Sequence, residues 1–284
     1  MLKRRLIAGA TALFCLVCPS LAQDKPMQFV TSADGIRIAY ETQGSGPPLI
    51  FVVGAFNDHQ TGAALAQVLA ADFTVITYDR RGRGQSGDAP EYTVQKEIDD
   101  LAALLPMAGT APALLGFSSG AMMVVEGAQR GLAASRLILV EPPYVLDASR
   151  PRPAADFPDR LRALIAEGRR GEAVELFQTD FIGMPREIVE QSRNAPFRPA
   201  LEAMAQSTVY DATIASTLTL DRERAGMIRQ PVLSISGSDS APFLVETARA
   251  LAEMVPDGRY VAIDGMNHDL SPALAPAISD FLEQ

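Results

Sequence analysis

The chain has 284 residues, of which 48% are apolar and 21% charged, a balance that excludes an intrinsically disordered protein and suits a sizeable core. Acidic residues outnumber basic ones 34 to 25, and the net charge of −9 argues against nucleic acid or an anionic membrane surface as partners. The length is compatible with one α/β unit, since such units often reach about 200–250 residues.

The first 22 residues have the layout of a cleaved secretory signal. Basic residues at positions 3–5 precede an apolar stretch over residues 6–17, which is too short for a membrane span of about 20 residues. Small residues at Ser20 and Ala22 predict cleavage after Ala22, and an uncleaved N-terminal anchor is the alternative. Cleavage removes both cysteines and three basic residues, which leaves 22 basic against 34 acidic residues and a net charge of −12. We therefore expect an exported protein, periplasmic or secreted, without a disulfide or a remaining membrane span.

After the signal, strand-like and helix-like patterns alternate. Expected strands cover residues 27–32, 36–42, 49–53, 73–78, 113–117, 137–140, 231–236 and 259–263. Expected helices cover residues 63–70, 93–105, 120–130, 243–254 and 274–282. Asp34 and Gly35 indicate a hairpin turn between the first two strands, whereas most later strands are apolar runs typical of a sheet buried on both faces. The order predicts an α/β fold with a doubly wound, mostly parallel sheet and an antiparallel edge.

Residues 144–229 interrupt this alternation. The segment is rich in proline and shows no convincing buried strand, and helical patterns cover residues 160–167, 171–179, 188–194 and 199–209. We interpret it as a helical cap inserted into a core made of residues 23–143 and 230–284. Its larger apolar side chains are candidates for lining a pocket, although most are expected to pack the cap onto the core: Phe157, Phe177, Phe181, Met184, Phe197, Met204 and Tyr210.

The main chemical signal is the sequence GFSSG at residues 116–120. A G-x-S-x-G pattern between an apolar strand and a helix of small residues is typical of a nucleophile elbow, and an ordinary Gly/Ser turn is the alternative. The glycines permit a very tight turn, which holds the central serine in a strained conformation with its hydroxyl exposed at the edge of the sheet. The N-terminus of the following helix favours developing negative charge. Ser118, as the central residue, is the predicted nucleophile in preference to Ser119.

A serine hydroxyl needs a base to become a good nucleophile, and the chain offers two histidines. In this type of fold the chain order is serine, acid, histidine. Only His268, which follows the last expected strand, fits that order. We predict that His268 is the base and that His59 is a loop residue near the mouth of the site.

The third catalytic group is expected to be a carboxylate that orients the imidazole. Asp239 is the predicted acid because it follows the strand before the last one. Glu141, at the end of an earlier strand, is the alternative, because some proteins with this fold take the acid from that strand. Asp211 and Asp264 are weaker candidates.

Backbone amides are the expected donors to the oxyanion. One is the N–H of Ser119, and the other comes from the loop after Val53, with Ala55 preferred and Phe56 second. The predicted substrate-contacting side chains are Phe56, Phe117, Phe181 and Tyr210.

Together these segments resemble the α/β-hydrolase superfamily over essentially the whole mature chain. Residues 78–86 (YDRRGRGQS) are similar to the superfamily's D-x-R-G-x-G-x-S loop, which implies a structural role for the arginines close to the site. Many members carry His-Gly at the oxyanion loop where this chain has Val53 and Gly54, so the loop must be supported differently. Serine at the elbow departs from the dehalogenase and epoxide-hydrolase branches, which use aspartate there.

The resemblance implies a serine esterase with a helical cap, acting on a small-molecule ester or lactone through an acyl-enzyme and needing no metal or organic cofactor. Carbon–carbon bond hydrolysis and cofactor-free perhydrolysis use the same three residue types on this fold and are alternatives. A non-catalytic binding protein on the same scaffold is a further alternative, which reaction with a serine-directed probe distinguishes.

Overall fold

The computed structural model describes residues 27–109, 111–146 and 152–284. The predicted signal segment therefore lies outside the described residues. None of the helices within these ranges has the length and apolar character needed to cross a membrane.

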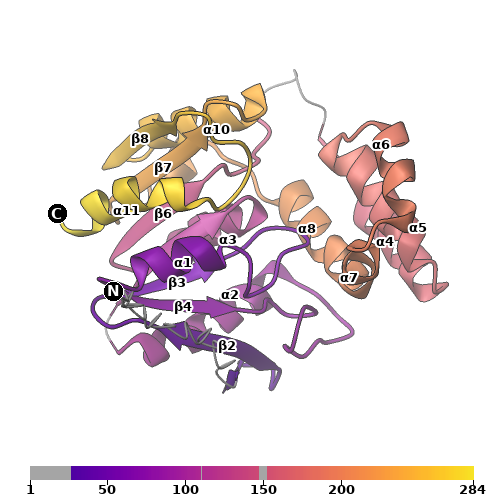
Figure 1. Cartoon of the computed structure of the whole chain (residues 1–284), viewed down its shortest axis with the longest axis horizontal. Coiled ribbons are helices and arrows are strands. Elements are labelled where there is room, and N and C mark those ends of the chain that lie inside the picture. Colours follow the sequence, from indigo (N-terminus) through magenta and orange to yellow (C-terminus); the bar gives the residue numbers. More distant parts are fainter. Residues whose placement is uncertain (1–26, 110, 147–151) are drawn as a thin grey trace, which may run out of the picture.

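One sheet runs through the described part of the chain (Figure 1). Its strands are β1 (Gln28–Thr31), β2 (Arg37–Gln43), β3 (Pro48–Val52), β4 (Thr74–Tyr78), β5 (Ala113–Phe117), β6 (Arg136–Val140), β7 (Val232–Gly237) and β8 (Gly258–Ile263). They lie in the order β1-β2-β4-β3-β5-β6-β7-β8. β2 pairs antiparallel with β1 and with β4, and all the other neighbours are parallel. The predicted mostly parallel sheet with an antiparallel edge is confirmed.

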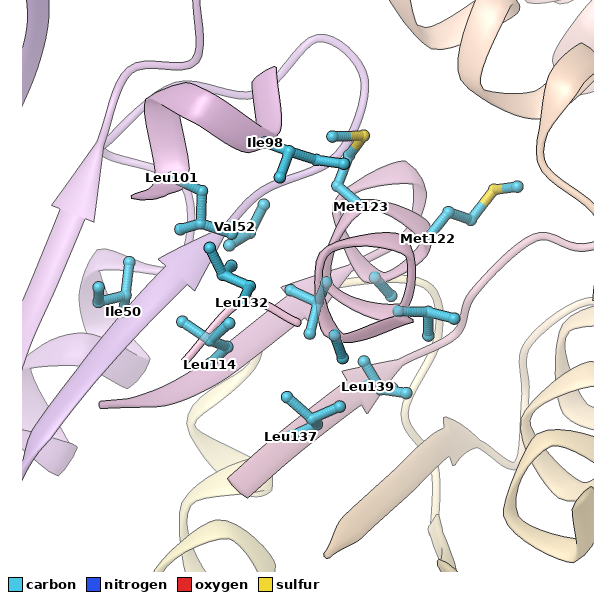
Figure 2. Packing of buried hydrophobic residues seen from close by; sticks show 14 of the residues in the cluster. Ile50, Val52, Ile98, Leu101, Leu114, Met122, Met123, Leu132, Leu137 and Leu139 are labelled. Atoms are coloured by element: carbon cyan, nitrogen blue, oxygen red, sulfur yellow. The ribbon is translucent and has the colours of Figure 1, made fainter. Parts of the chain in front are cut away.

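Helices cover both faces of the sheet because its strands are apolar on both sides. They are α1 (Ala63–Leu69), α2 (Val94–Leu104), α3 (Ser119–Gln129), α10 (Pro242–Met254) and α11 (Ala275–Leu282). Along β3, Leu49 and Phe51 pack on the side of α1 and α11, whereas Ile50 and Val52 pack on the side of α2 and α3 (Figure 2). Each fully buried aliphatic side chain of this kind stabilises the fold by about 1.5–3 kcal/mol.

The insertion between β6 and β7 is helical, as predicted. Its elements are α4 (Phe157–Ala166), α5 (Arg170–Leu176), the π-helix η2 (Phe177–Ile182), α6 (Arg186–Gln191), the 3₁₀ turn η3 (Ser192–Asn194), α7 (Arg198–Ala203), α8 (Ala205–Thr217) and α9 (Arg222–Ala225). Helix α8 lies between the rest of the cap and the core (Figure 1). Residues of α4, α5, η2 and α8 form a small core of their own, against which Ala55 and Phe56 of the loop after β3 also pack. The cap therefore rests directly on the loop predicted to hold the oxyanion.

Short 3₁₀ turns complete the described elements. They are η1 (Leu105–Ala108) and η4 (Pro272–Leu274).

Candidate active site

The turn between β5 and α3 has the geometry of a nucleophile elbow. Ser118 adopts φ 54° and ψ −126°, a strained conformation that costs about 1–3 kcal/mol. A Cβ at Gly116 would lie 2.4 Å from Ala121 Cα, and one at Gly120 would lie 2.0 Å from the Val52 carbonyl oxygen. Only glycine fits at either position, so the pattern seen in the sequence has a steric cause.

His268, in the loop after β8, pairs with a carboxylate through Nδ1. Its ring is hydrogen-bonded to Oε2 of Glu141, and the other carboxylate oxygen accepts the Gly237 N–H at 2.7 Å. Glu141 is fully buried and directly follows β6, whose Val140 carbonyl accepts the N–H of Ser118 at 2.9 Å. With Nδ1 engaged, Nε2 is the ring nitrogen left for proton transfer.

The structure contradicts the predicted pairing of Asp239 with His268 and supports the alternative acid, Glu141. Asp239 is exposed: its N–H donates to the Met266 carbonyl at 3.0 Å, and its carboxylate accepts from Ser238 Oγ at 3.1 Å. Asp239 lies in the turn after β7, and these contacts keep it at the surface. Asp264, a weaker candidate, is also exposed, with its carboxylate 3.5 Å from Ser238 Oγ.

Ser118 and His268 share one cavity of about 360 Å³ between the core and the cap. Its walls are mainly apolar, with side chains that include Phe117, Phe177, Phe181, Ile182, Phe243 and Leu244. The Phe117 ring lies 4.7 Å from the imidazole ring, between centroids. No hydrogen bond joins Ser118 to His268 in the described part of the chain, and such bonds often tighten only when substrate binds. A larger cleft of about 850 Å³ between cap and core contains neither residue.

Two backbone N–H groups are placed to act as the donors of an oxyanion hole. Ser119 is the first residue of α3, so its N–H has no acceptor within the helix. Ala55 lines the cavity, and the preceding Gly54 lies so close to the nucleophile that a Cβ there would be 2.7 Å from Ser118 Cβ. Phe56, the second choice, has φ 56° and packs edge-on against Phe177 at 5.4 Å.

Two buried arginines donate hydrogen bonds to backbone carbonyls of the loop after β3. Arg80 donates to the Val53 carbonyl at 3.1 Å, and Arg83 donates to the carbonyls of Gly54 and, at 3.1 Å, of Asn57. These contacts support the loop, in which Val53 precedes Gly54. The resemblance placed both arginines near the site but did not indicate which carbonyls they contact.

Asp211 on α8 is the carboxylate that balances these arginines. Its oxygens lie 3.0 Å from Arg80 Nη1 and 2.7 Å from Arg83 Nη2, and it accepts a third hydrogen bond from Ser119 Oγ at 2.7 Å. Burial opposes its charge, yet the two arginines and Ser119 lower the pKa of Asp211 below its usual value. Arg80 also pairs with the buried Glu97 at 2.5 Å. The sequence makes Asp211 only a weak candidate for the catalytic acid. Its role in binding the arginines could have been suspected from one feature, an acidic residue on a helix whose neighbouring residues are mostly buried.

His59 links two loops through hydrogen bonds to a buried aspartate. Its N–H and its Nδ1 lie 2.9 Å and 2.8 Å from Oδ1 of the buried Asp79. It is not among the described residues that line the cavity around Ser118. His59 therefore ties the loop after β3 to the loop after β4.

The four predicted substrate-contacting side chains separate into two pairs. Phe117 and Phe181 line the cavity. Phe56 packs against Phe177 behind the wall, and Tyr210 is buried, with its ring stacked on Tyr92 at 4.1 Å and its hydroxyl bonded to Asp88 at 2.5 Å. Those two predictions are not supported by the geometry, because both rings are used for packing the cap onto the core.

Comparison with known proteins agrees with this geometry. The sequence profile of the alpha/beta hydrolase family matches residues 49–278. The crystal structure of an alpha/beta hydrolase from Sphaerobacter thermophilus is 44% identical, with a TM-score of 0.83, over 90% of this chain and 100% of that one. The uncharacterized hydrolase YraK of Bacillus subtilis is 28% identical over 246 residues, 82% of this chain and 86% of that protein. A non-heme haloperoxidase of Rhodococcus erythropolis is 25% identical over 267 residues, 89% of this chain and 97% of that protein. The chain belongs to the alpha/beta hydrolase family.

Proposed function

We propose that the protein is an exported serine hydrolase that cleaves small, neutral carboxylic esters through Ser118, His268 and Glu141. One observation carries the proposal: a strained serine shares a mainly apolar cavity with a histidine whose Nδ1 is held by a buried carboxylate. Nothing in the packing of the core requires that combination.

The reaction follows from these positions. Nε2 of His268 takes the proton of Ser118 Oγ as the oxygen attacks the ester carbonyl carbon, and the carbonyl electrons move onto oxygen. The N–H groups of Ser119 and Ala55 donate to that oxyanion. The tetrahedral intermediate collapses, and the alcohol leaves with the proton from His268. Water then hydrolyses the acyl-enzyme by the same steps, while Glu141 stays ionised and stabilises the imidazolium.

The cavity favours a neutral substrate with a short or medium acyl group. Among the described residues that line it, none is lysine or arginine, and the charge of Asp211 is already balanced by Arg80 and Arg83. A carboxylate on the substrate would lose its hydration without gaining a partner, which is strongly unfavourable. A volume of about 360 Å³ lies at the lower end of ligand sites.

Steady-state hydrolysis of p-nitrophenyl butyrate tests the proposal. We expect turnover by the wild type, and a fall in kcat of at least about 10³-fold in Ser118→Ala and in His268→Ala. Ser279→Ala on helix α11, away from the cavity, is the matched serine control and should match the wild type. Absence of turnover by the folded wild type over a series of neutral esters would reject the proposal.

A matched anionic ester tests the substrate class. We expect the p-nitrophenyl monoester of succinic acid, which resembles the butyrate in length, to react with a kcat/KM at least about 100-fold lower because its carboxylate finds no cation in the cavity. Equal values for the two esters would contradict the neutral-substrate assignment and leave the serine mechanism intact.

Perhydrolysis is a second candidate, favoured by the similarity to the non-heme haloperoxidase of Rhodococcus erythropolis. In that reaction hydrogen peroxide replaces water: His268 takes its proton as the peroxide oxygen attacks the acyl carbon, the bond to Ser118 breaks, Ser118 regains the proton, and the acyl group leaves as a peracid. Formation of peracetic acid from acetate and hydrogen peroxide, lost in Ser118→Ala, would support it. Ester hydrolysis without peracid formation would reject it.

A further inference from the structure

The carbonyl of the peptide between Gly54 and Ala55 is bound by a buried arginine. Arg83 donates to the Gly54 carbonyl and, at 3.1 Å, to the Asn57 carbonyl, so one guanidinium spans the oxyanion loop, residues 53–57. The Arg83 side chain is fully buried. Arg80 adds a third contact, at 3.1 Å to the Val53 carbonyl.

Because the peptide group is planar, the contact of Arg83 with the Gly54 carbonyl also sets the direction of the Ala55 N–H, the proposed oxyanion donor. In a trans peptide the C=O of one residue and the N–H of the next point in opposite directions. When Arg83 fixes the Gly54 carbonyl, it therefore also fixes the Ala55 N–H, which points the opposite way within the same peptide plane. A charged donor on the carbonyl additionally polarises the peptide, which makes its N–H a stronger donor.

A single carboxylate of the cap connects Arg83 with Ser119, whose N–H is one of the two proposed oxyanion donors. Asp211 accepts from Arg83 Nη2 and from Ser119 Oγ, both at 2.7 Å. We propose that Arg83 is a positioning residue that orients the Ala55 N–H, and that Asp211 holds Arg83 and Ser119 so that docking of the cap assembles the oxyanion hole. This inference rests on the proposed serine mechanism.

The neighbouring Arg81 shows that a buried ion pair formed by an arginine of this loop can lie outside the candidate active site. Arg81 binds Asp100 through two hydrogen bonds of 2.7 Å and Asp34 at 3.0 Å, and it donates to the Lys96 carbonyl. None of these partners belongs to the oxyanion loop or lines the cavity. Arg81 therefore provides a matched control of similar burial and charge.

The decisive variant removes both charges together, Arg83→Met with Asp211→Asn. A single Arg83→Met change leaves Asp211 and Glu97 facing only Arg80, whereas the double change keeps the buried charge balanced and should regain much of the lost stability. The Gly54 carbonyl still lacks its donor. We therefore expect the double variant to melt closer to the wild type than Arg83→Met does, with kcat still about 100-fold low and KM within about threefold.

A thiono ester reports on the oxyanion hole itself. Sulfur accepts hydrogen bonds more weakly than oxygen, so an intact hole favours p-nitrophenyl butyrate over its C=S analogue. We expect the ratio of the two kcat values to fall at least about tenfold in the double variant and to stay at the wild-type value in Arg81→Met with Asp100→Asn. Rates are expressed per folded molecule, measured by thermal unfolding. If the double variant does not fold, Arg83→Lys, which keeps the positive charge, replaces it. The same ratio of kcat values for the oxygen and sulfur esters is then measured in Arg83→Lys.

The outcomes separate this inference from the proposed function. If the wild type turns over esters through Ser118 and the double variant regains kcat together with stability, Arg83 is structural only and the inference is overturned. An unchanged oxygen-to-sulfur ratio in folded variants would overturn it as well. If the wild type shows no Ser118-dependent turnover at all, the proposed function itself fails.

Discussion

Glu141 combines three features that ordinary structural residues avoid: full burial, a carboxylate paired with a histidine, and a φ of 50°. The strained backbone costs about 1–3 kcal/mol and places the carboxylate between the Gly237 N–H and the ring of His268. Ser118, its neighbour across β5 and β6, is strained in the same way. The strain is located where the proposed chemistry needs fixed positions.

Substitution of the two acids distinguishes their roles. We expect Glu141→Gln to lower kcat by at least about 10³-fold with little change in KM, because a neutral amide neither stabilises the imidazolium nor selects its tautomer. Asp239→Asn is the matched control and should stay within about twofold of the wild type. The measurement is ester hydrolysis by purified variants, and the reverse pattern would restore Asp239 as the acid.

The nucleophile and the base could be predicted from the sequence because each depends on local features. The elbow is a five-residue pattern whose glycines have steric causes at Ala121 and Val52, and chain order selects His268. The acid could not be predicted with the same success. The ends of β6 and β7 lie side by side at one edge of the sheet, so Glu141 and Asp239 fit the chain order equally well.

At the scale of elements, the π-helix η2 shapes the cavity. It brings Phe177 and Phe181 to the wall, with ring centroids 4.5 Å apart, together with Ile182. π-Helices are rare and occur frequently at functional sites. The aromatic pair therefore sets the space available to an acyl chain.

Removal of one of these rings should change the acyl-chain preference. We expect Phe181→Ala to raise the ratio of kcat/KM for p-nitrophenyl octanoate over butyrate at least about fivefold, since the loss of a ring enlarges a compact apolar site. Phe197→Ala, a cap aromatic that is 55% exposed, is the control and should leave the ratio unchanged. A ratio unaffected by Phe181→Ala would place the acyl chain elsewhere.

The core elements could be predicted to within one or two residues, because buried parallel strands are apolar runs with clear ends. The cap was less predictable. A single helix was expected over residues 199–209, but the backbone at Met204, with φ −95° and ψ 5°, separates α7 from α8. The helical pattern over residues 171–179 predicts one helix across α5 and the first half of the π-helix, because hydrophobic periodicity does not distinguish the two helix types over one turn.

At the scale of the whole molecule, Asp211 fastens the cap to the core. It belongs to α8, whereas Arg80 and Arg83 belong to the loop after β4. Breaking one member of a buried ion pair typically costs about 3–5 kcal/mol, far more than an exposed pair contributes. The sequence could not show this link, because 128 positions separate Arg83 from Asp211.

The lowered pKa of Asp211 makes this contribution dependent on pH. A carboxyl whose pKa falls on folding stabilises the protein above its unfolded pKa, about 3.9, and loses that contribution as the pH drops through its lower folded value. We expect Asp211→Asn to reduce the free energy of unfolding by about 3–5 kcal/mol at neutral pH, and this difference from the wild type to shrink below about pH 4.

Urea unfolding at neutral and acidic pH measures that difference. Asp239→Asn, at an exposed position, is the control and should differ from the wild type by less than about 0.5 kcal/mol. A deficit in Asp211→Asn that is the same at both pH values would mean that packing, and not charge, is lost.

Fluorophosphonate labelling of the folded protein, with the modified residue mapped by mass spectrometry, tests the central claim most directly. The reagent forms a bond from phosphorus to the serine oxygen and expels fluoride, which requires an activated hydroxyl. The account predicts one label per molecule, on Ser118, lost in His268→Ala and strongly slowed in Glu141→Gln. A folded protein that stays unlabelled, while a control hydrolase reacts, would contradict the serine mechanism and favour a binding role for the same scaffold.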